Sequence, residues 1–261
     1  MSSVLTDLKD GVFRILLNHP HLHNALDEDM IEGLHGALET ARQSGCRVVV
    51  LEGKGRSFCA GADIDWMRRQ GEASKADNEL SAQRLSSLYE AIDTLDLPVI
   101  GRVHGAAIGG GLGLVAVSDI AVASSRSHFA LPEVRLGLLP AIIAPYVARK
   151  IGLSVSRDLM LTGRRVDASE AHRIGLVHRV VNEDQIDEAV SEVVDDLKAG
   201  GPEAIGHTKR LLRRLPGLLA ENATNLARQT ADEIARARSS QEGREGTQAF
   251  LQKKQPPWLK S

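Results

Sequence analysis

Two short turns of small residues constrain this chain more than any other feature of its sequence. The first turn, Cys59-Ala60-Gly61-Ala62-Asp63-Ile64, follows the apolar run 48–51. The second turn, Gly109-Gly110-Gly111-Leu112-Gly113, follows the apolar pair Val99-Ile100 by a few residues. Each apolar run is typical of a buried strand, and each turn leads into a segment that reads as helix. Such strand-to-helix turns leave backbone N–H groups open to a ligand, because no large side chain stands in the way.

Two such turns can direct two N–H groups at one oxygen. That arrangement is an oxyanion hole, which stabilises the negative charge that develops on a carbonyl oxygen. The alternative interpretation is that residues 109–111 only permit close packing of a helix against a strand.

The composition has the balance of apolar and charged residues that is ordinary for soluble proteins. Its 261 residues are 43% hydrophobic and 25% charged, with a net charge of −2. The N-terminus lacks the features of a signal or transit peptide, and no apolar run reaches membrane-spanning length. We therefore expect a cytoplasmic protein that does not bind membranes. Cys46 and Cys59 are too few for a disulfide scaffold, and we expect Cys59 to serve packing.

Two local patterns suggest other functions but carry little weight. Three histidines, at 19, 21 and 23, alternate along the chain, yet no carboxylate or cysteine completes a metal site, so we expect no metal. Residues 209–214 carry a basic stripe that is typical of the solvated face of a helix. Because net charge is near zero and aromatic residues make up only 3% of the chain, we expect no nucleic-acid partner.

Strand and helix patterns alternate over the first two-thirds of the chain. Strands are predicted at 11–17, 48–52, 99–103 and 120–123, and helices at 28–43, with Asp27 as N-cap, and at 78–95. The polar stretch 67–78 is predicted to be a mobile loop. This alternation favours an α/β fold with parallel strands. Beyond residue 200 the pattern predicts only helices, at 202–215 and 218–238.

A third motif, Leu131-Pro132-Glu133-Val134-Arg135-Leu136-Gly137, completes a family signature. In this order and spacing, the three motifs resemble the crotonase superfamily of enoyl-CoA hydratases and isomerases, over nearly the whole chain. The resemblance implies the ClpP/crotonase spiral fold, an α/β fold of repeated ββα units. It also implies a core with the active site at 1–200, a helical trimerisation region at 201–261, and a homotrimer or dimer of trimers.

The resemblance assigns roles to individual residues. The N–H groups of Ala62 and Gly110 would bind the thioester carbonyl of an acyl-CoA, and Glu133 would carry the proton. Apolar neighbours would raise the pKa of this carboxyl toward a useful value, unless it is a surface glutamate of a loop. Contacts to coenzyme A, which is part of the substrate rather than a cofactor, would come from residues of both turns and of the tail: Ala60, Asp63, Ile64, Gly109, Lys253 and Lys254. The two lysines are equally consistent with a solvated tail.

One position departs from the standard hydratase pattern. Gly113 stands at the second catalytic position, where such hydratases carry another glutamate. Two carboxylates conventionally hold the water that is added, whereas one carboxylate suits an isomerase that moves a proton between carbons. Hydration and Δ3,Δ2-isomerisation therefore both remain open.

A second resemblance favours hydration. Residues 59–67 and 133–147 are similar to a bacterial methylglutaconyl-CoA hydratase branch of leucine breakdown, whose members also have glycine at this position. Its substrates carry a distal carboxylate, and either this carboxylate or an unidentified polar side chain could help to replace the missing glutamate. Arg135 is a candidate partner for that carboxylate, and a structural salt bridge is its alternative role.

Overall fold

The main β-sheet has the strand order β1-β2-β3-β4-β6-β9 within the residues that the structure describes, 2–219 and 223–259. In this computed structural model β1 and β2 pair antiparallel, and all other neighbours pair parallel. The strands are β1 (Val4–Lys9), β2 (Val12–Leu17), β3 (Val48–Gly53), β4 (Val99–Val103), β6 (Ile120–Ser124) and β9 (Arg179–Val181). The central strands β3 and β4 are almost entirely buried, as expected for parallel strands covered on both faces. The predicted α/β class is confirmed.

A small second sheet brings the two turns together. It consists of β5 (Ala106–Ile108), β7 (His128–Ala130) and β8 (Arg165–Asp167), with β7 in the centre. The chain leaving β3 runs beside β5, where Cys59 N–H donates to Ala106 O at 3.0 Å and Ile108 N–H donates to Cys59 O at 3.0 Å. This pairing places the first turn directly beside the start of the second.

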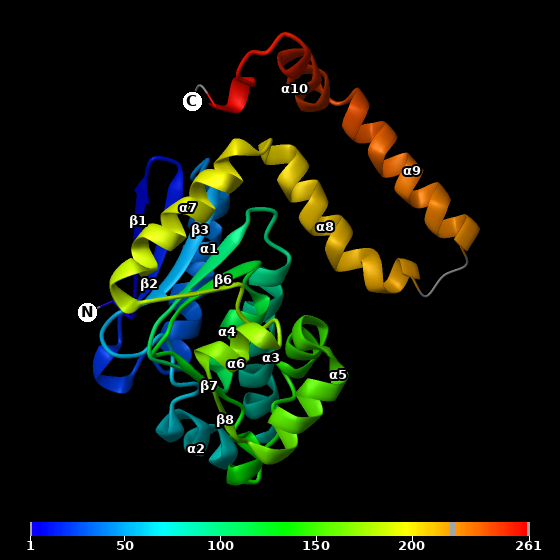
Figure 1. Cartoon of the computed structure of the whole chain (residues 1–261). Helices are drawn as coiled ribbons and strands as arrows, with labels where there is room; N and C mark the ends of the chain where they lie inside the picture. Colours follow the sequence, from blue (N-terminus) through cyan, green and yellow to red (C-terminus); the bar gives the residue numbers. More distant parts are fainter. Residues whose placement is uncertain (1, 220–222, 260–261) are drawn as a thin grey trace.

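Helices cover both faces of the main sheet (Figure 1). Side chains alternate along β3, so that Val49 and Leu51 join the core under α1, α3 and α4, while Val48 and Val50 pack under α7. The helices of this part are α1 (Glu28–Gln43), α2 (Ile64–Glu72), α3 (Lys75–Asp93), α4 (Gly110–Val117), α5 (Ala144–Thr162), α6 (Ala168–Arg173) and α7 (Ile186–Ala199).

Two helical predictions in this part had different outcomes. The helix at 28–43 is confirmed, and the Asp27 carboxylate accepts from Met30 N–H at 2.8 Å as its N-cap. The loop predicted for 67–78 is wrong, because α2 extends to Glu72 and α3 begins at Lys75. Both helices have capping side chains, Asp63 for α2 and Ser74 for α3. Their polar sequence reflects exposure on the surface rather than a missing helix.

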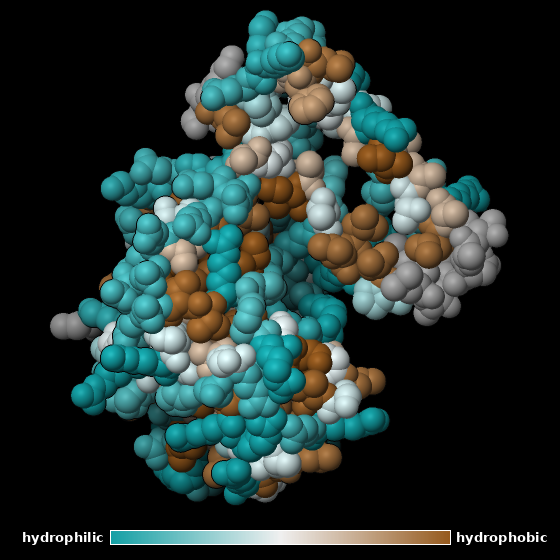
Figure 2. Space-filling model, viewed as in Figure 1, coloured by the Kyte–Doolittle hydropathy of each residue, from teal (hydrophilic) through white to brown (hydrophobic). Residues whose placement is uncertain are grey.

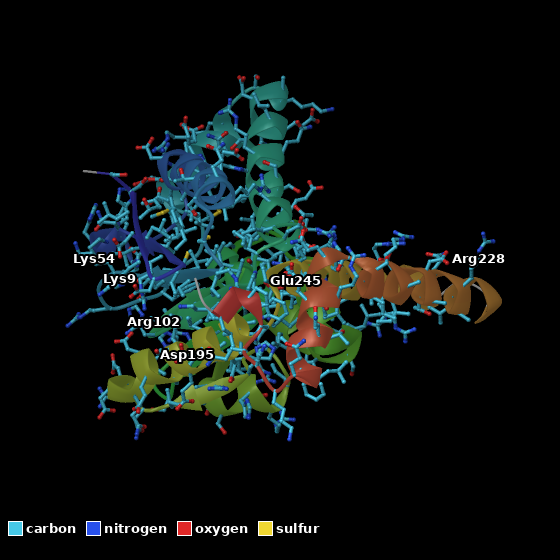
Figure 3. The ribbon with its side chains drawn as sticks, turned by 90° about the horizontal axis from the view of Figure 1, so that it is seen from above. Lys9, Lys54, Arg102, Asp195, Arg228 and Glu245 are labelled. Carbon is cyan, nitrogen blue, oxygen red and sulfur yellow. The ribbon has the colours of Figure 1, made fainter. Side chains whose placement is uncertain are left out.

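The C-terminal region is helical, as predicted. It contains α8 (Pro202–Leu219), α9 (Ala223–Ser239) and α10 (Gln241–Leu251). The first helix continues through Pro216 rather than ending at 215, and the helix predicted for 218–238 includes residues 220–222, which lie outside the described residues. The α9 helix extends away from the sheets, with Arg228 near its far end, and α10 returns toward α7 (Figures 1 and 3).

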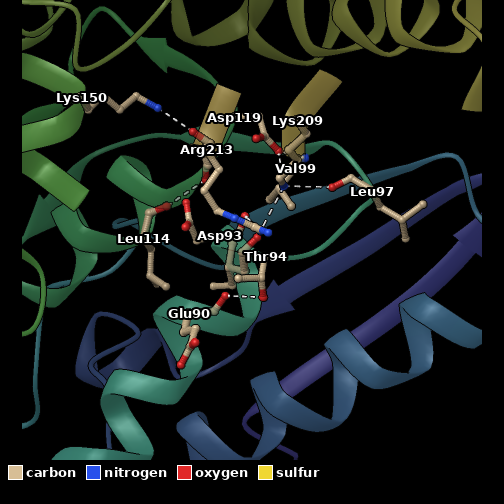
Figure 4. A network of polar contacts seen from close by, with 12 residues as sticks. Glu90, Asp93, Thr94, Leu97, Val99, Leu114, Asp119, Lys150, Lys209 and Arg213 are labelled. Carbon is tan, nitrogen blue, oxygen red and sulfur yellow. Dashed lines mark hydrogen bonds and ion pairs between the residues drawn. The ribbon is translucent and has the colours of Figure 1, made fainter. Parts of the chain in front are cut away.

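Side chains hold the helices of this region together and attach α8 to the sheets. The Glu242 carboxylate of α10 accepts from the free N–H groups of Glu203 and Ala204, at 2.9 and 2.7 Å, in the first turn of α8. The Lys209 ammonium lies 2.6 Å from Asp119 and also donates to Leu97 O at 3.1 Å (Figure 4). A groove of about 580 Å³ remains beside these contacts, and brown apolar surface is visible where α8 faces the sheets (Figure 2).

Among the described helices, none combines the length and the apolar character needed to cross a membrane.

Candidate active site

The two turns meet edge to edge. Leu26 clamps the first turn, because its N–H donates to Gly61 O at 2.7 Å and its carbonyl accepts from Asp63 N–H at 2.9 Å. A Cβ built on Gly61 would lie 3.7 Å from Gly110 N, and one built on Gly110 would lie 3.9 Å from Ala62 N. Within residues 2–219 and 223–259, the N–H groups of Ala62 and Gly110 donate to no acceptor. The structure therefore brings together the two N–H groups expected to form the oxyanion hole, and both are free to bind a ligand.

The three consecutive glycines have different structural roles. Gly111 allows close packing, since a Cβ there would lie 2.1 Å from Cys59 O. Gly109 has a φ of 51° as N-cap of α4, a conformation that favours glycine. Gly110 begins α4, and a Cβ there would meet Leu26 Cδ1 and Tyr89 Oη, each at 2.9 Å. Close packing is thus a real function of this motif, and it coexists with an open N–H at Gly110.

The helix α4 adds favourable electrostatics. Its N-terminus is Gly110, so the positive end of the helix dipole lies at the free N–H groups. At its other end Lys150 donates to Ser118 O at 2.5 Å and to Val115 O at 3.3 Å. Burial lowers the pKa of Lys150 to about 8, against the opposing charge of Asp119. The ammonium and the helix C-terminus stabilise each other.

Glu133 lies next to the second turn. It begins the short 3-10 helix η2 (Glu133–Leu136), which follows Pro132. Its Oε1 would lie only 3.0 Å from a Cβ on Gly109, and its Oε2 is buried without a hydrogen-bond partner in the described chain. Burial raises the pKa of the Glu133 carboxyl, and a backbone hydrogen bond partly opposes this effect. A half-buried carboxyl with one uncommitted oxygen is suited to exchange a proton with a bound molecule.

Residue 113, where a second glutamate would stand, has no room for a side chain. Gly113 lies in the buried middle of α4, and a Cβ there would be 2.4 Å from Ile143 Cγ2 and 2.9 Å from Tyr89 Cε1. The space that a side chain would need at residue 113 is therefore filled by Ile143 of the neighbouring loop and by the Tyr89 ring of α3.

Tyr89 lies at the second turn, although no sequence motif pointed to it. Its hydroxyl donates to Gly110 O at 2.9 Å, and its side chain is completely buried. Burial raises the pKa of Tyr89 well above its ordinary value, and the charge of Glu133 adds to this effect. The one feature of the sequence that could have drawn attention to this residue is that the chain has only two tyrosines. In the structure the ring centroids of Tyr89 and Tyr146 lie 6.1 Å apart.

The residues expected to bind coenzyme A lie in two separate places. Ala60 and Asp63 belong to the first turn, where Ala60 N–H donates to His23 O at 3.0 Å and the Asp63 carboxylate accepts from Trp66 N–H at 2.7 Å. Ile64 is 63% exposed and available for contact. Lys253 and Lys254 lie beyond α10, exposed, and no hydrogen bond or ion pair joins them to the turns in the described structure.

Arg135 has a structural contact. Its Nε and Nη2 both donate to Thr162 O at 3.2 Å, at the C-terminus of α5. The guanidinium thus satisfies a helix-end carbonyl, which is a structural role by hydrogen bonding rather than by the salt bridge considered above. It remains exposed, two residues after Glu133.

Other titratable groups near the turns have structural roles. Burial raises the pKa of Cys59 to about 12, so its thiol stays protonated and packs in the core. His23 Nδ1 lies 3.0 Å from Ser57 Oγ. Among the described residues, no group of three or more His, Cys, Asp or Glu could hold a metal ion.

Known proteins are similar to this chain in sequence and in architecture. A family model described as enoyl-CoA hydratase/isomerase matches residues 7–261. The crystal structure of an enoyl-CoA hydratase from Shewanella pealeana is 38% identical with a TM-score of 0.94, and 98% of this chain and 96% of that chain are covered. An enoyl-CoA hydratase structure from Mycobacterium smegmatis is 32% identical with a TM-score of 0.91, covering 99% and 100%. Enoyl-CoA hydratase ACTT6 of Alternaria alternata is 36% identical over 234 residues, covering 89% of this chain and 76% of that protein. The predicted crotonase fold is confirmed.

Proposed function

Because the chain belongs to the enoyl-CoA hydratase/isomerase family of enzymes, we propose that it adds water across the 2,3 double bond of an enoyl-CoA thioester. The observation that carries this proposal is the Glu133 carboxyl, with a free Oε2, beside the unpaired N–H groups of Ala62 and Gly110. Coenzyme A enters as part of the substrate.

The arrangement supports a simple sequence of bond changes. The thioester oxygen accepts from the N–H groups of Ala62 and Gly110, which makes C3 of the enoyl group electrophilic. Glu133 takes a proton from water while the water oxygen bonds to C3. The same carboxyl then returns a proton to C2, so that one molecule of water is added and Glu133 ends as it began.

We further propose a 3-methylglutaconyl-CoA type of substrate. The similarity of residues 59–67 and 133–147 to that branch supports it, and the exposed Arg135 supports it through its place near Glu133. The substrate's distal carboxylate would approach the guanidinium edge that does not face Thr162.

Δ3,Δ2-Enoyl-CoA isomerisation is the second candidate. The filled space at Gly113 favours it, because no second carboxylate fits at residue 113 to share the work of Glu133. In this reaction Glu133 would remove a proton from C2 and return one to C4, with no water added.

One assay separates these candidates. Purified protein is given crotonyl-CoA, a 3-enoyl-CoA and 3-methylglutaconyl-CoA, and the absorbance of the conjugated thioester is followed. We expect loss of absorbance with both conjugated esters, fastest with the methylglutaconyl ester. Conversion of the 3-enoyl ester alone would instead establish the isomerase.

Two variants test the residues. Glu133→Gln should abolish turnover, whereas Glu39→Gln, on the exposed face of α1, should not. Arg135→Ala should reduce activity on the methylglutaconyl ester more than on crotonyl-CoA. An equal loss on both esters would refute the pairing with the distal carboxylate.

We also propose assembly into trimers or dimers of trimers. Leucines between η2 and the end of α5 are strongly exposed in the single chain, and such an assembly would cover them: Leu136, Leu139, Leu153 and Leu161. Light scattering coupled to size-exclusion chromatography would test this state.

A further inference from the structure

The direction of the Gly110 N–H depends on how its own peptide plane and the two neighbouring planes are held. It lies within three consecutive glycines, which restrict the backbone little, and its own peptide plane is held by Gly109 O, which accepts from Gly113 N–H at 3.0 Å. An oxyanion hole is effective because its donors are fixed before the reaction begins, so any rotation of this peptide weakens it.

Hydrogen bonds anchor the peptide planes on both sides of that N–H. The plane before it is held by Gly109 N–H, which donates to Ala130 O at 2.8 Å. The plane after it carries Gly110 O, which accepts from the Tyr89 hydroxyl at 2.9 Å. Tyr89 is therefore the side chain that restrains the second plane, and it does so from α3, a different helix.

The packing of Tyr89 makes this restraint rigid. The side chain is completely buried, and its Cε1 would lie 2.9 Å from a Cβ on Gly113. The same ring thus occupies space that a larger residue at 113 would require. A small residue at 113 and a tyrosine at 89 are complementary.

We propose that Tyr89 is the positioning residue of the oxyanion hole, and that Gly113 is small in order to admit its ring. The Tyr89 hydroxyl fixes the Gly110–Gly111 peptide plane, which adjoins the plane that carries the Gly110 N–H, and so keeps that N–H directed at the thioester oxygen. This role rests on the proposed function, since it presumes a thioester carbonyl in the hole. It does not depend on whether water is added or a proton is moved.

The test uses Tyr89→Phe, which removes the hydroxyl and keeps the ring. Tyr146→Phe is the matched control, because it removes the other tyrosine hydroxyl. We expect Tyr89→Phe to lower kcat about tenfold, the effect of one hydrogen bond of about 1.4 kcal/mol. KM should change less than twofold, and Tyr146→Phe should retain kcat.

A second readout does not require turnover. Butyryl-CoA labelled with carbon-13 at the carbonyl is saturated and cannot react, and the infrared stretch of its bound carbonyl reports polarisation by the hole. We expect a smaller shift to low frequency in Tyr89→Phe than in the wild type.

The outcomes separate this inference from the proposed function. A wild type that converts none of the three esters but still shifts the butyryl carbonyl refutes the function, and the infrared comparison then decides the role of Tyr89. If the infrared shift of bound butyryl-CoA is the same in Tyr89→Phe as in the wild type, the inference is overturned. Tyr89 would then be a packing residue only, even if the variant has lower thermal stability. A wild type that produces no shift overturns it as well.

Discussion

Restoring the second carboxylate by Gly113→Glu should damage the protein rather than improve hydration. A Cβ at 113 would be 2.4 Å from Ile143 Cγ2 and 2.9 Å from Tyr89 Cε1, whereas carbon atoms in good contact are about 3.5–4.0 Å apart. Overpacking of this kind costs about 1–3 kcal/mol. Alanine is better than glycine in a helix interior by about 1 kcal/mol. The control Gly113→Ala should therefore lose about 0–2 kcal/mol of the free energy of unfolding.

The glutamate adds more atoms and a carboxyl to the same buried place. Removing an unpaired carboxylate from water costs several kcal/mol more, so we expect Gly113→Glu to lose at least about 4 kcal/mol from a total that is about 5–15 kcal/mol for most domains. Equilibrium urea unfolding at a fixed protein concentration measures both variants, and the crotonyl-CoA assay measures hydration. The description of residue 113 as a position without room for a side chain is refuted if two results occur together. The free energy of unfolding of Gly113→Glu would lie within about 1 kcal/mol of the wild-type value, and the variant would hydrate crotonyl-CoA faster.

Three further predictions concern pH and stability. Because burial raises the pKa of Glu133 and hydration needs its ionised form, kcat/KM should fall on the acid side at a pH above the ordinary glutamate value of about 4.3; a pH–rate profile with a midpoint at or below that value would contradict this. Lys209→Met leaves Asp119 without its 2.6 Å partner and should cost about 2–3 kcal/mol in urea unfolding, whereas the exposed Lys75→Met should be neutral. Asp63→Ala removes the N-cap of α2 and should cost about 1 kcal/mol, with Asp63→Asn close to wild type; equal losses in both would argue against a capping role.

The sequence was most informative where the determinants are local. The order of apolar runs and small-residue turns predicted the α/β class, and Asp27 predicted the start of α1. The loop predicted for 67–78 was wrong because a surface helix buries few side chains, so its pattern is weak. Ser74 followed three residues later by Asp77 was the overlooked sign, since the Ser74 hydroxyl caps α3 and contacts the Asp77 carboxylate.

Contacts between distant segments could not be predicted in the same way. Tyr89 lies 21 residues before Gly110 and reaches it only because α3 packs against α4. The closed space at Gly113 depends on Ile143, which comes from a loop 30 residues later. Neither contact can be predicted from periodicity or composition, because each depends on how whole helices pack against one another and against the sheet.

The backbone hydrogen bonds that join the first turn to Leu26 and to β5 affect how such a protein can change during evolution. Because backbone peptide groups supply the donors of the proposed oxyanion hole, side chains other than those of the glycine turn and Tyr89 can change without removing them. The acid–base half, in contrast, depends on single side chains such as Glu133. Related proteins with this fold can therefore change their reaction by substituting a few acid–base residues, while the backbone N–H groups that polarise the carbonyl are retained.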